Sequence, residues 1–168
     1  MLGSTNYDFG ITTTNKLVYK KGNLVDAFVN GDVVHMIHGC NCFNIMGSGI
    51  AQTIKSRLPE MNEADQETIK GDVYKFGSFS YHDYGNCFGF NVYCQYNYGN
   101  KGLYLDYDAL EVSLKSVSNF LEERCGVDNP QVIGLPMIGC GLAGGDWNKV
   151  LPIIQKTLLK HTVYIYQL

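Results

Sequence analysis

Two segments of the chain share one pattern: an apolar run, a glycine-rich turn and then a helical sequence. They read "HMIHGCNCFNIMGSGIAQTI" (residues 35 to 54) and "VIGLPMIGCGLAGGDWNKV" (residues 132 to 150). Short apolar runs that end in turns are typical of strands covered on both faces. A glycine turn lets the backbone approach a ligand, and the free amides of a following helix favour an anion. The pattern predicts a covered sheet whose two turns could hold a diphosphate from both sides.

The rest of the chain continues this alternation of strands and helices. Alternating or continuous apolar runs predict strands within residues 16–24, 32–41, 75–83, 87–98, 131–139 and 162–168. Apolar residues at helical spacing predict helices within residues 50–58, 60–69, 106–126 and 146–160. The third and fourth strands are expected to form a hairpin around Tyr84-Gly85-Asn86. The order predicts an α/β protein, a three-layer α/β/α sandwich with a central mixed β-sheet.

The length of the chain indicates one domain, and its charge argues against two classes of binding partner. The 168 residues fit one domain, with residues 1–15 as a loosely held N-terminal extension. Thirteen basic against sixteen acidic side chains give a net charge of -3 without a basic cluster, so we expect neither general nucleic-acid binding nor attachment to a membrane surface. No signal peptide or membrane-spanning run is visible, so we expect a soluble, cytoplasmic monomer.

The cysteines do not form a recognisable metal site. Six of them lie at positions 40, 42, 87, 94, 125 and 140, without a C-x-x-C pair. The "CNC" at residues 40–42 could suggest a metal, but no second ligand pair with zinc-like spacing accompanies it. We therefore expect free thiols, no metal and no cofactor.

The glycine turns do not match the common nucleotide motifs. Residues 139–144 spell G-x-G-x-x-G, but only one helix and one strand follow, and no acidic residue follows Asp146. A dinucleotide fingerprint opens the first strand–helix–strand unit and needs a carboxylate about 20 residues later. Neither turn carries the Gly-Lys-Ser/Thr of a P-loop. The phosphate site predicted here is of another kind.

Three sequence blocks resemble the macrodomain family. They are "KKGNL" (20–24), "HGCNCFNIMGSGIA" (38–51) and "LPMIGCGLAGGDW" (135–147), and their order covers the chain from about Lys16 to Leu168. The resemblance is to the branch of ADP-ribose-1''-phosphate phosphatases and terminal ADP-ribose glycohydrolases. It implies a macrodomain-like fold and ADP-ribose or ADP-ribose-1''-phosphate as the small-molecule ligand.

The resemblance also implies roles for individual residues. The adenine end would be lined by Gly22, Asn23 and Leu24, although macrodomains often carry Asp where Asn23 stands. The diphosphate would be wrapped by Met46, Gly47, Ser48, Gly49, Ile50, Ala51, Ile138, Gly139, Cys140, Gly141 and Leu142. The distal ribose would be met by Asn41 and by the turn of Ala143, Gly144, Gly145 and Asp146.

The candidate catalytic residues are Asp146, His38 and Asn41, and each has a structural alternative. Asp146 could handle a proton or cap the following helix. His38 could act as a general acid or support the loop through a hydrogen bond from below. Asn41 could contact the distal ribose or form an Asx turn. These alternatives stay open at the level of sequence.

Three functions follow from these residues. The first is hydrolysis of the phosphate monoester of ADP-ribose-1''-phosphate, and the second is ADP-ribose binding without turnover. The third is removal of ADP-ribose from modified macromolecules. The glycohydrolase branch uses a mid-chain lysine and an aspartate directly after G-C-G-L, whereas this chain has only Lys70 near the first position and Ala143 at the second. The third function is therefore the least supported.

Overall fold

The chain folds around one six-stranded sheet. The computed structural model describes residues 16–168, so the predicted N-terminal extension lies outside the described residues. The strands are β1 (Lys16–Lys21), β2 (His35–Asn41), β3 (Phe79–Asp83), β4 (Phe88–Gln95), β5 (Val132–Leu135) and β6 (Thr162–Gln167). Their order across the sheet is β1-β6-β5-β2-β4-β3. All neighbours are parallel except β3, which pairs antiparallel with β4 through the predicted hairpin.

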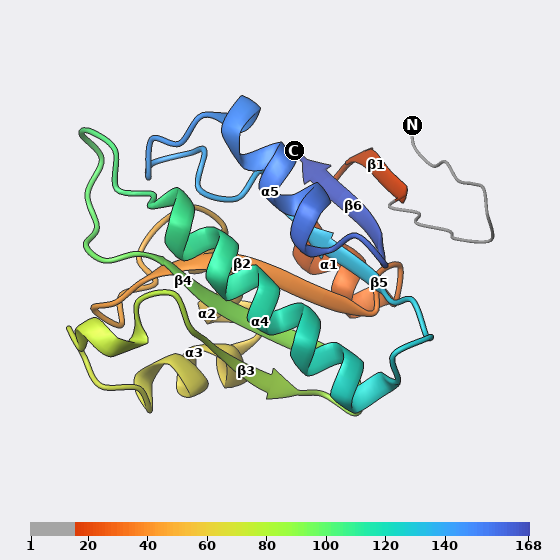
Figure 1. The fold of residues 1–168 in the computed structure, drawn as a ribbon. Coiled ribbons are helices and arrows are strands. Elements are labelled where there is room, and N and C mark those ends of the chain that lie inside the picture. Colours follow the sequence, from red (N-terminus) through yellow and green to blue (C-terminus); the bar gives the residue numbers. More distant parts are fainter. Residues whose placement is uncertain (1–15) are drawn as a thin grey trace.

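Helices cover both faces of this sheet (Figure 1). They are α1 (Leu24–Asn30), α2 (Gly49–Arg57), α3 (Pro59–Gln66), α4 (Tyr107–Cys125) and α5 (Trp147–Thr157). α4 and α5 pack together on one face, whereas α1, α2 and α3 contact the strands from the other. The predicted fold class, a three-layer sandwich with a mixed sheet, is confirmed.

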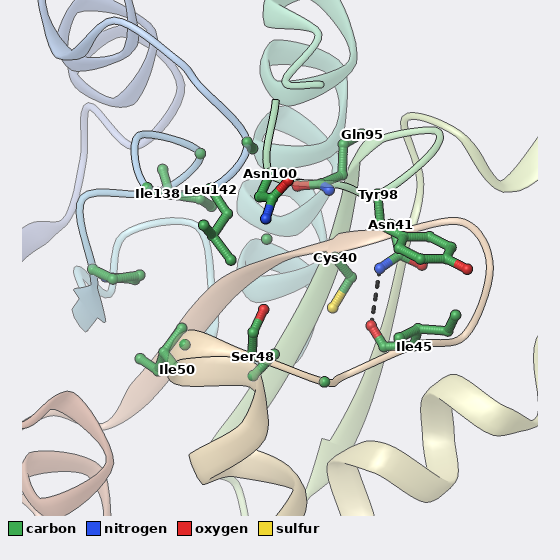
Figure 2. A pocket seen from close by; sticks show the side chains of 18 of the residues that line it. Cys40, Asn41, Ile45, Ser48, Ile50, Gln95, Tyr98, Asn100, Ile138 and Leu142 are labelled. Carbon is green, nitrogen blue, oxygen red and sulfur yellow. Dashed lines mark hydrogen bonds between the residues drawn. The ribbon is translucent and has the colours of Figure 1, made fainter. Parts of the chain in front are cut away.

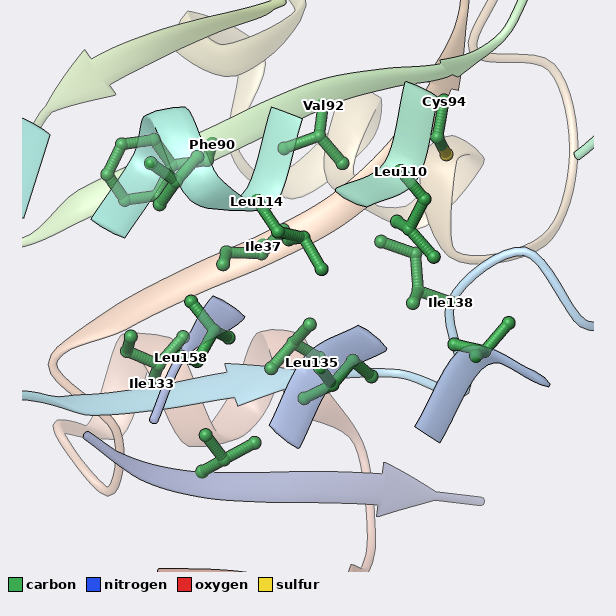
Figure 3. Close-up of a cluster of buried hydrophobic side chains, with 14 of the residues drawn as sticks. Ile37, Phe90, Val92, Cys94, Leu110, Leu114, Ile133, Leu135, Ile138 and Leu158 are labelled. Carbon is green, nitrogen blue, oxygen red and sulfur yellow. The ribbon is translucent and has the colours of Figure 1, made fainter. Parts of the chain in front are cut away.

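Each face has its own apolar core. Figure 3 shows the larger one, in which Ile37, Phe90 and Val92 of the sheet meet Leu110 and Leu114 of α4. All five side chains are completely buried. The second core, under α1, α2 and α3, contains fully buried side chains such as Met36, Ile54 and Met61. Because both faces are covered, the central strands are mostly apolar, as the sequence indicated, and polar residues within them such as His38 and Asn91 are buried.

Two short elements were not predicted from the sequence. α1 has seven residues, too few for a clear apolar repeat, and follows its N-cap Asn23. A 3-10 turn, η1 (Val73–Lys75), begins after Asp72, whose side chain accepts a hydrogen bond from the Tyr74 amide. In residues 16–168, no helix is both long enough and apolar enough to cross a membrane.

Candidate functional site

A cavity of about 670 Å³ opens where β2, β4 and β5 end. The three strands are parallel, so their carboxyl ends lie at one edge of the sheet, where ligands of open α/β sheets usually bind. The predicted residues that line the cavity are Asn41, Gly47, Ser48, Gly49, Ile50, Ala51, Ile138, Gly139, Gly141, Leu142 and Ala143. The structure thus brings the two glycine turns together as two walls of one cavity (Figure 2).

The first wall ends at the N-terminus of α2. Ser48 is the N-cap residue, but its hydroxyl makes no capping bond. Gly49 has a φ of 60°, a left-handed conformation that favours glycine. The hydroxyl of Ser48 and the first amides of the helix are therefore available to an anion in the cavity.

Asn41 both shapes this wall and lines the cavity. Its Oδ1 accepts a hydrogen bond from the Phe43 amide at 2.8 Å, and its Nδ2 donates to the Ile45 carbonyl at 2.9 Å. The second of these bonds is drawn in Figure 2. The first is the Asx turn considered as the structural alternative, and the side chain retains one amide hydrogen for a ligand.

The second wall depends on close backbone packing. The Gly145 amide donates to the Gly139 carbonyl at 2.8 Å, which closes the turn. A Cβ on Gly139 would lie 2.7 Å from the methyl groups of Leu105, and one on Gly144 would overlap the Gly102 carbonyl oxygen. These glycines are needed because the turn is pressed against the segment that follows β4.

A third wall comes from residues that the sequence analysis did not assign to the site. Gln95, at the end of β4, and Tyr98, Gly99 and Asn100 after it all line the cavity. Gly39, Cys40, Ile45, Pro136 and Met137 complete the lining. The sequence contained a signal for this wall, because β4 is an apolar run followed by the polar and glycine-rich "QYNYGNKG". The sequence predicts β4 only as the second strand of a hairpin, because its parallel pairing with β2 is a tertiary feature.

The residues predicted for the adenine end do not line this cavity. Asn23 caps α1, with its Oδ1 accepting from the Asp26 amide at 3.1 Å, and Leu24 is buried in the second core. The Gly22 amide donates to the Gln167 carbonyl at 2.7 Å. Five residues predicted for the diphosphate and ribose ends also lie outside the lining: Met46, Cys140, Gly144, Gly145 and Asp146. Their positions within the two turns make them supports of the walls.

His38 lies inside the protein and is not part of the cavity lining. Its side chain is fully buried, and its Nε2 is 2.7 Å from Oδ1 of Asn91. Because the Asn91 amide nitrogen donates to the Met61 carbonyl and to Ser80, Oδ1 is the acceptor and His38 donates. Burial lowers the pKa of His38 to about 4, although the bond to Asn91 opposes this. This environment matches the structural role considered for His38, a hydrogen-bonded support, more closely than that of a general acid.

Asp146 also lies outside the cavity lining. It is the N-cap residue of α5, with one carboxylate oxygen accepting from the Asn148 amide at 3.0 Å, and its own amide donates to the Tyr107 hydroxyl. The carboxylate is exposed. The capping role considered in the sequence analysis is present, and the second oxygen remains free for other chemistry.

The cavity contains no charged side chain. None of its lining residues is an Asp, Glu, Lys, Arg or His, so the polar groups that face a ligand are backbone amides, hydroxyls and carboxamides. Lys70 is exposed and lies outside the lining. Within residues 16–168, no group of three or more His, Cys, Asp or Glu side chains could hold a metal ion. Any anion bound here is held mainly by uncharged hydrogen-bond donors.

A buried lysine holds the loop that leads into the first wall. Lys75 is 7% exposed, and its Nζ donates to Oδ1 of Asn44 and, at 2.7 Å, to the Thr68 hydroxyl. Asn44 has a φ of 60° and donates from its own side chain to the Thr68 carbonyl at 3.0 Å. The nearby Asp65 is also buried and accepts a hydrogen bond from Tyr93. This network fixes residues 42–46 against α3 and η1.

Replacement of Lys75 with methionine is expected to lower the free energy of unfolding by about 2–4 kcal/mol, because it leaves Asn44 and Thr68 short of a buried donor and Asp65 without a nearby cation. Urea denaturation measures the loss. Lys70→Met is the matched control, since Lys70 is exposed and should change stability by less than about 0.5 kcal/mol. Equal stability of the two variants would contradict the structural role of Lys75.

Solved structures with the same fold include several macrodomains. The macrodomain of Thermus aquaticus DarG superimposes with a TM-score of 0.70 at 22% identity, over 92% of this chain and 99% of that one. Thermosipho africanus DarTG, solved in complex with ADP-ribose, gives a TM-score of 0.61 at 18% identity, over 80% of this chain and 38% of that one. The chain therefore has the macrodomain fold.

A sequence relative places the chain in a family. It is 35% identical over 141 residues, 81% of this chain and 86% of the other, to the uncharacterized 17.5 kDa protein in the tk-vs intergenic region of Enterobacteria phage T4. The chain belongs to the family of this phage protein. No protein-family model matches the sequence.

Proposed function

We propose that the protein binds ADP-ribose in the cavity between its two glycine turns. The observation that carries the proposal is the convergence of both turns and the α2 N-terminus on one cavity at the end of parallel strands. Uncharged amides suit a diphosphate, because they approach its oxygens closely without a cation. The structural likeness to DarTG, which was solved with ADP-ribose, supports the same ligand.

We propose further that the ligand is turned over when it is ADP-ribose-1''-phosphate. Water attacks the phosphorus, the bond between phosphorus and the ribose oxygen breaks, and ADP-ribose leaves with a proton on that oxygen. The donors in the walls stabilise the charge on the transferred phosphoryl group. Asp146 follows the second turn and uses one oxygen as a helix cap, so its other oxygen takes a proton from the attacking water and returns it to the departing ribose oxygen. Asn41 binds the distal ribose through its remaining amide hydrogen.

Two measurements on the same preparations test these proposals. Calorimetry measures ADP-ribose binding, and phosphate release from ADP-ribose-1''-phosphate measures turnover, each for the intact protein and for Asp146→Ala. We expect binding by both proteins and phosphate release by the intact protein only. Release should persist in EDTA, since the proposed reaction needs no metal. Undetectable ADP-ribose binding by the intact protein would refute the binding proposal itself.

The same cavity favours a second candidate function, ADP-ribose binding without turnover. Its lining has no carboxylate or imidazole, since His38 is fully buried outside the lining and Asp146 also lies outside it. A general acid or base normally lies within hydrogen-bond reach of the proton that it transfers. Tight ADP-ribose binding with no phosphate release would assign this function and leave Asp146 as a helix cap.

A further inference from the structure

The loop that leads into the first wall contains a residue in an unfavourable backbone conformation. Asn44 has a φ of 60°, and in residues 16–168 the only other non-glycine residue with a positive φ is Asn86, between β3 and β4. A side chain disfavours this left-handed conformation, although asparagine tolerates it better than most residues. Such a conformation persists only where surrounding contacts hold it, and it is frequent at functional sites. The contacts of Asn44 therefore bear on how the first wall is built.

Lys75 holds the side chain of Asn44 from outside the loop. Its Nζ donates to Oδ1 of Asn44 and, at 2.7 Å, to the Thr68 hydroxyl, and it lies 4.9 Å from the centre of the Tyr93 ring. All three partners are uncharged, and the lysine is buried. An ammonium group that has lost its water needs such partners. Lys75 therefore cannot leave Asn44 without a large cost, and it fixes the position of that side chain.

Asn44 in turn lies between the two backbone groups that hold Asn41. The Asn41 side chain accepts from the Phe43 amide at 2.8 Å and donates to the Ile45 carbonyl at 2.9 Å, the bond drawn in Figure 2. The dihedral angles of Asn44 set the direction in which Ile45 follows Phe43. They decide whether both bonds to Asn41 can form at once. The contact from Lys75 therefore acts on Asn41 through Asn44.

We propose that Lys75 and Asn44 are positioning residues, which hold Asn41 in the orientation that binds the distal ribose. This inference rests on the proposed binding of ADP-ribose, in which Asn41 meets that ribose. Neither positioning residue lines the cavity, so each acts through the loop and not by touching the ligand. Without Lys75 the loop keeps its conformation in only a fraction of the molecules, and the apparent affinity falls by that fraction.

Calorimetry with ADP-ribose and with ADP, which lacks the distal ribose, tests the proposal. Lys75→Met should bind ADP-ribose roughly tenfold more weakly, as expected if about a tenth of the molecules keep the loop conformation. ADP should lose clearly less affinity, because it does not reach Asn41. Asn44→Gly allows the positive φ but removes the acceptor for Lys75, so it should also weaken ADP-ribose more than ADP. The double variant should bind no more weakly than Lys75→Met, because both changes break one contact.

Two matched variants control for charge and for backbone conformation. Lys70→Met removes an exposed lysine outside the cavity lining. Asn86→Gly replaces the other asparagine with a positive φ, 65°, which also lies outside the lining. Both variants should bind ADP-ribose and ADP as the intact protein does. A loss of affinity in either of them would show that such substitutions act without the contact between Lys75 and Asn44, and would overturn the inference.

Binding is measured at a temperature where thermal unfolding shows each variant to be folded, which separates positioning from stability alone. If Lys75→Met is less stable but binds ADP-ribose as tightly as the intact protein, Lys75 only stabilises the fold and the inference is overturned. Equal weakening of ADP and ADP-ribose would also overturn it, because the effect would not pass through Asn41. In both cases ADP-ribose binding by the intact protein still stands. If the intact protein binds neither ligand, the proposed function fails, and this inference fails with it.

Discussion

Gly144→Ala is expected to weaken ADP-ribose binding by at least about 30-fold. Gly144 has a φ of 77°, and a Cβ there would overlap the carbonyl oxygen of Gly102. Backbone cannot move aside as a flexible side chain does, so the turn of residues 139–145 must shift away from the segment that follows β4. Gly139, Gly141 and Ala143 of that turn line the cavity, and their displacement removes several contacts at once. Calorimetry with ADP-ribose measures the effect.

Gly31→Ala is the matched control for this prediction. Gly31 has a similar φ of 84°, but a Cβ there would meet no atom within 4 Å, and the residue is the C-cap of α1 outside the cavity lining. The Gly31→Ala protein should lose about 1 kcal/mol of stability because alanine disfavours this backbone conformation, and its affinity for ADP-ribose should be unchanged. If Gly144→Ala also kept its affinity, the packing of the second turn would not be what shapes the site.

The free energy of unfolding is expected to fall by about 3 kcal/mol between pH 6.5 and pH 4 on account of His38. Burial lowers the pKa of His38 from 6.5 to about 4 in the folded protein. Between these values the unfolded chain binds the proton and the folded chain does not, so stability falls as the pH falls. Each pKa unit corresponds to about 1.4 kcal/mol. Urea denaturation at half-unit steps of pH measures the slope.

His38→Gln tests the assignment, because glutamine can still donate to Asn91 but does not titrate. The variant should be less stable than the intact protein at pH 7.5, owing to altered packing, yet lose clearly less stability on acidification. Some slope should remain, since burial also lowers the pKa of His35 and His161. The lowered pKa values of Glu60 and Glu122 act mainly below pH 4.5. If the free energy of unfolding depended on pH as steeply in the variant as in the intact protein, His38 would not be the main source of the pH dependence.

The strands and helices that the sequence predicts are those with a clear local pattern of apolar residues. The apolar runs of β2 and β5 are long and bounded by turns, and α4 carries an apolar stripe that ends at Gly126, so their type follows from sequence alone. α1 was missed because seven residues give too little periodicity, and its stability comes from burial of side chains such as Val25 and Phe28 under the sheet. Whether such a short helix forms depends on its packing against the rest of the protein and not on the helix propensity of its residues.

The candidate site also has a part that the sequence predicts and a part that depends on tertiary contacts. Sequence by itself determined the two glycine turns, the helix that follows each, and the family resemblance that makes ADP-ribose the expected ligand. Only the tertiary structure showed that Gln95, Tyr98 and Asn100 line the cavity, and that His38, which is fully buried, and Asp146 do not. The physical reason is that the pairing of β4 with β2, and the face on which each side chain of β2 lies, depend on contacts between segments far apart in the chain.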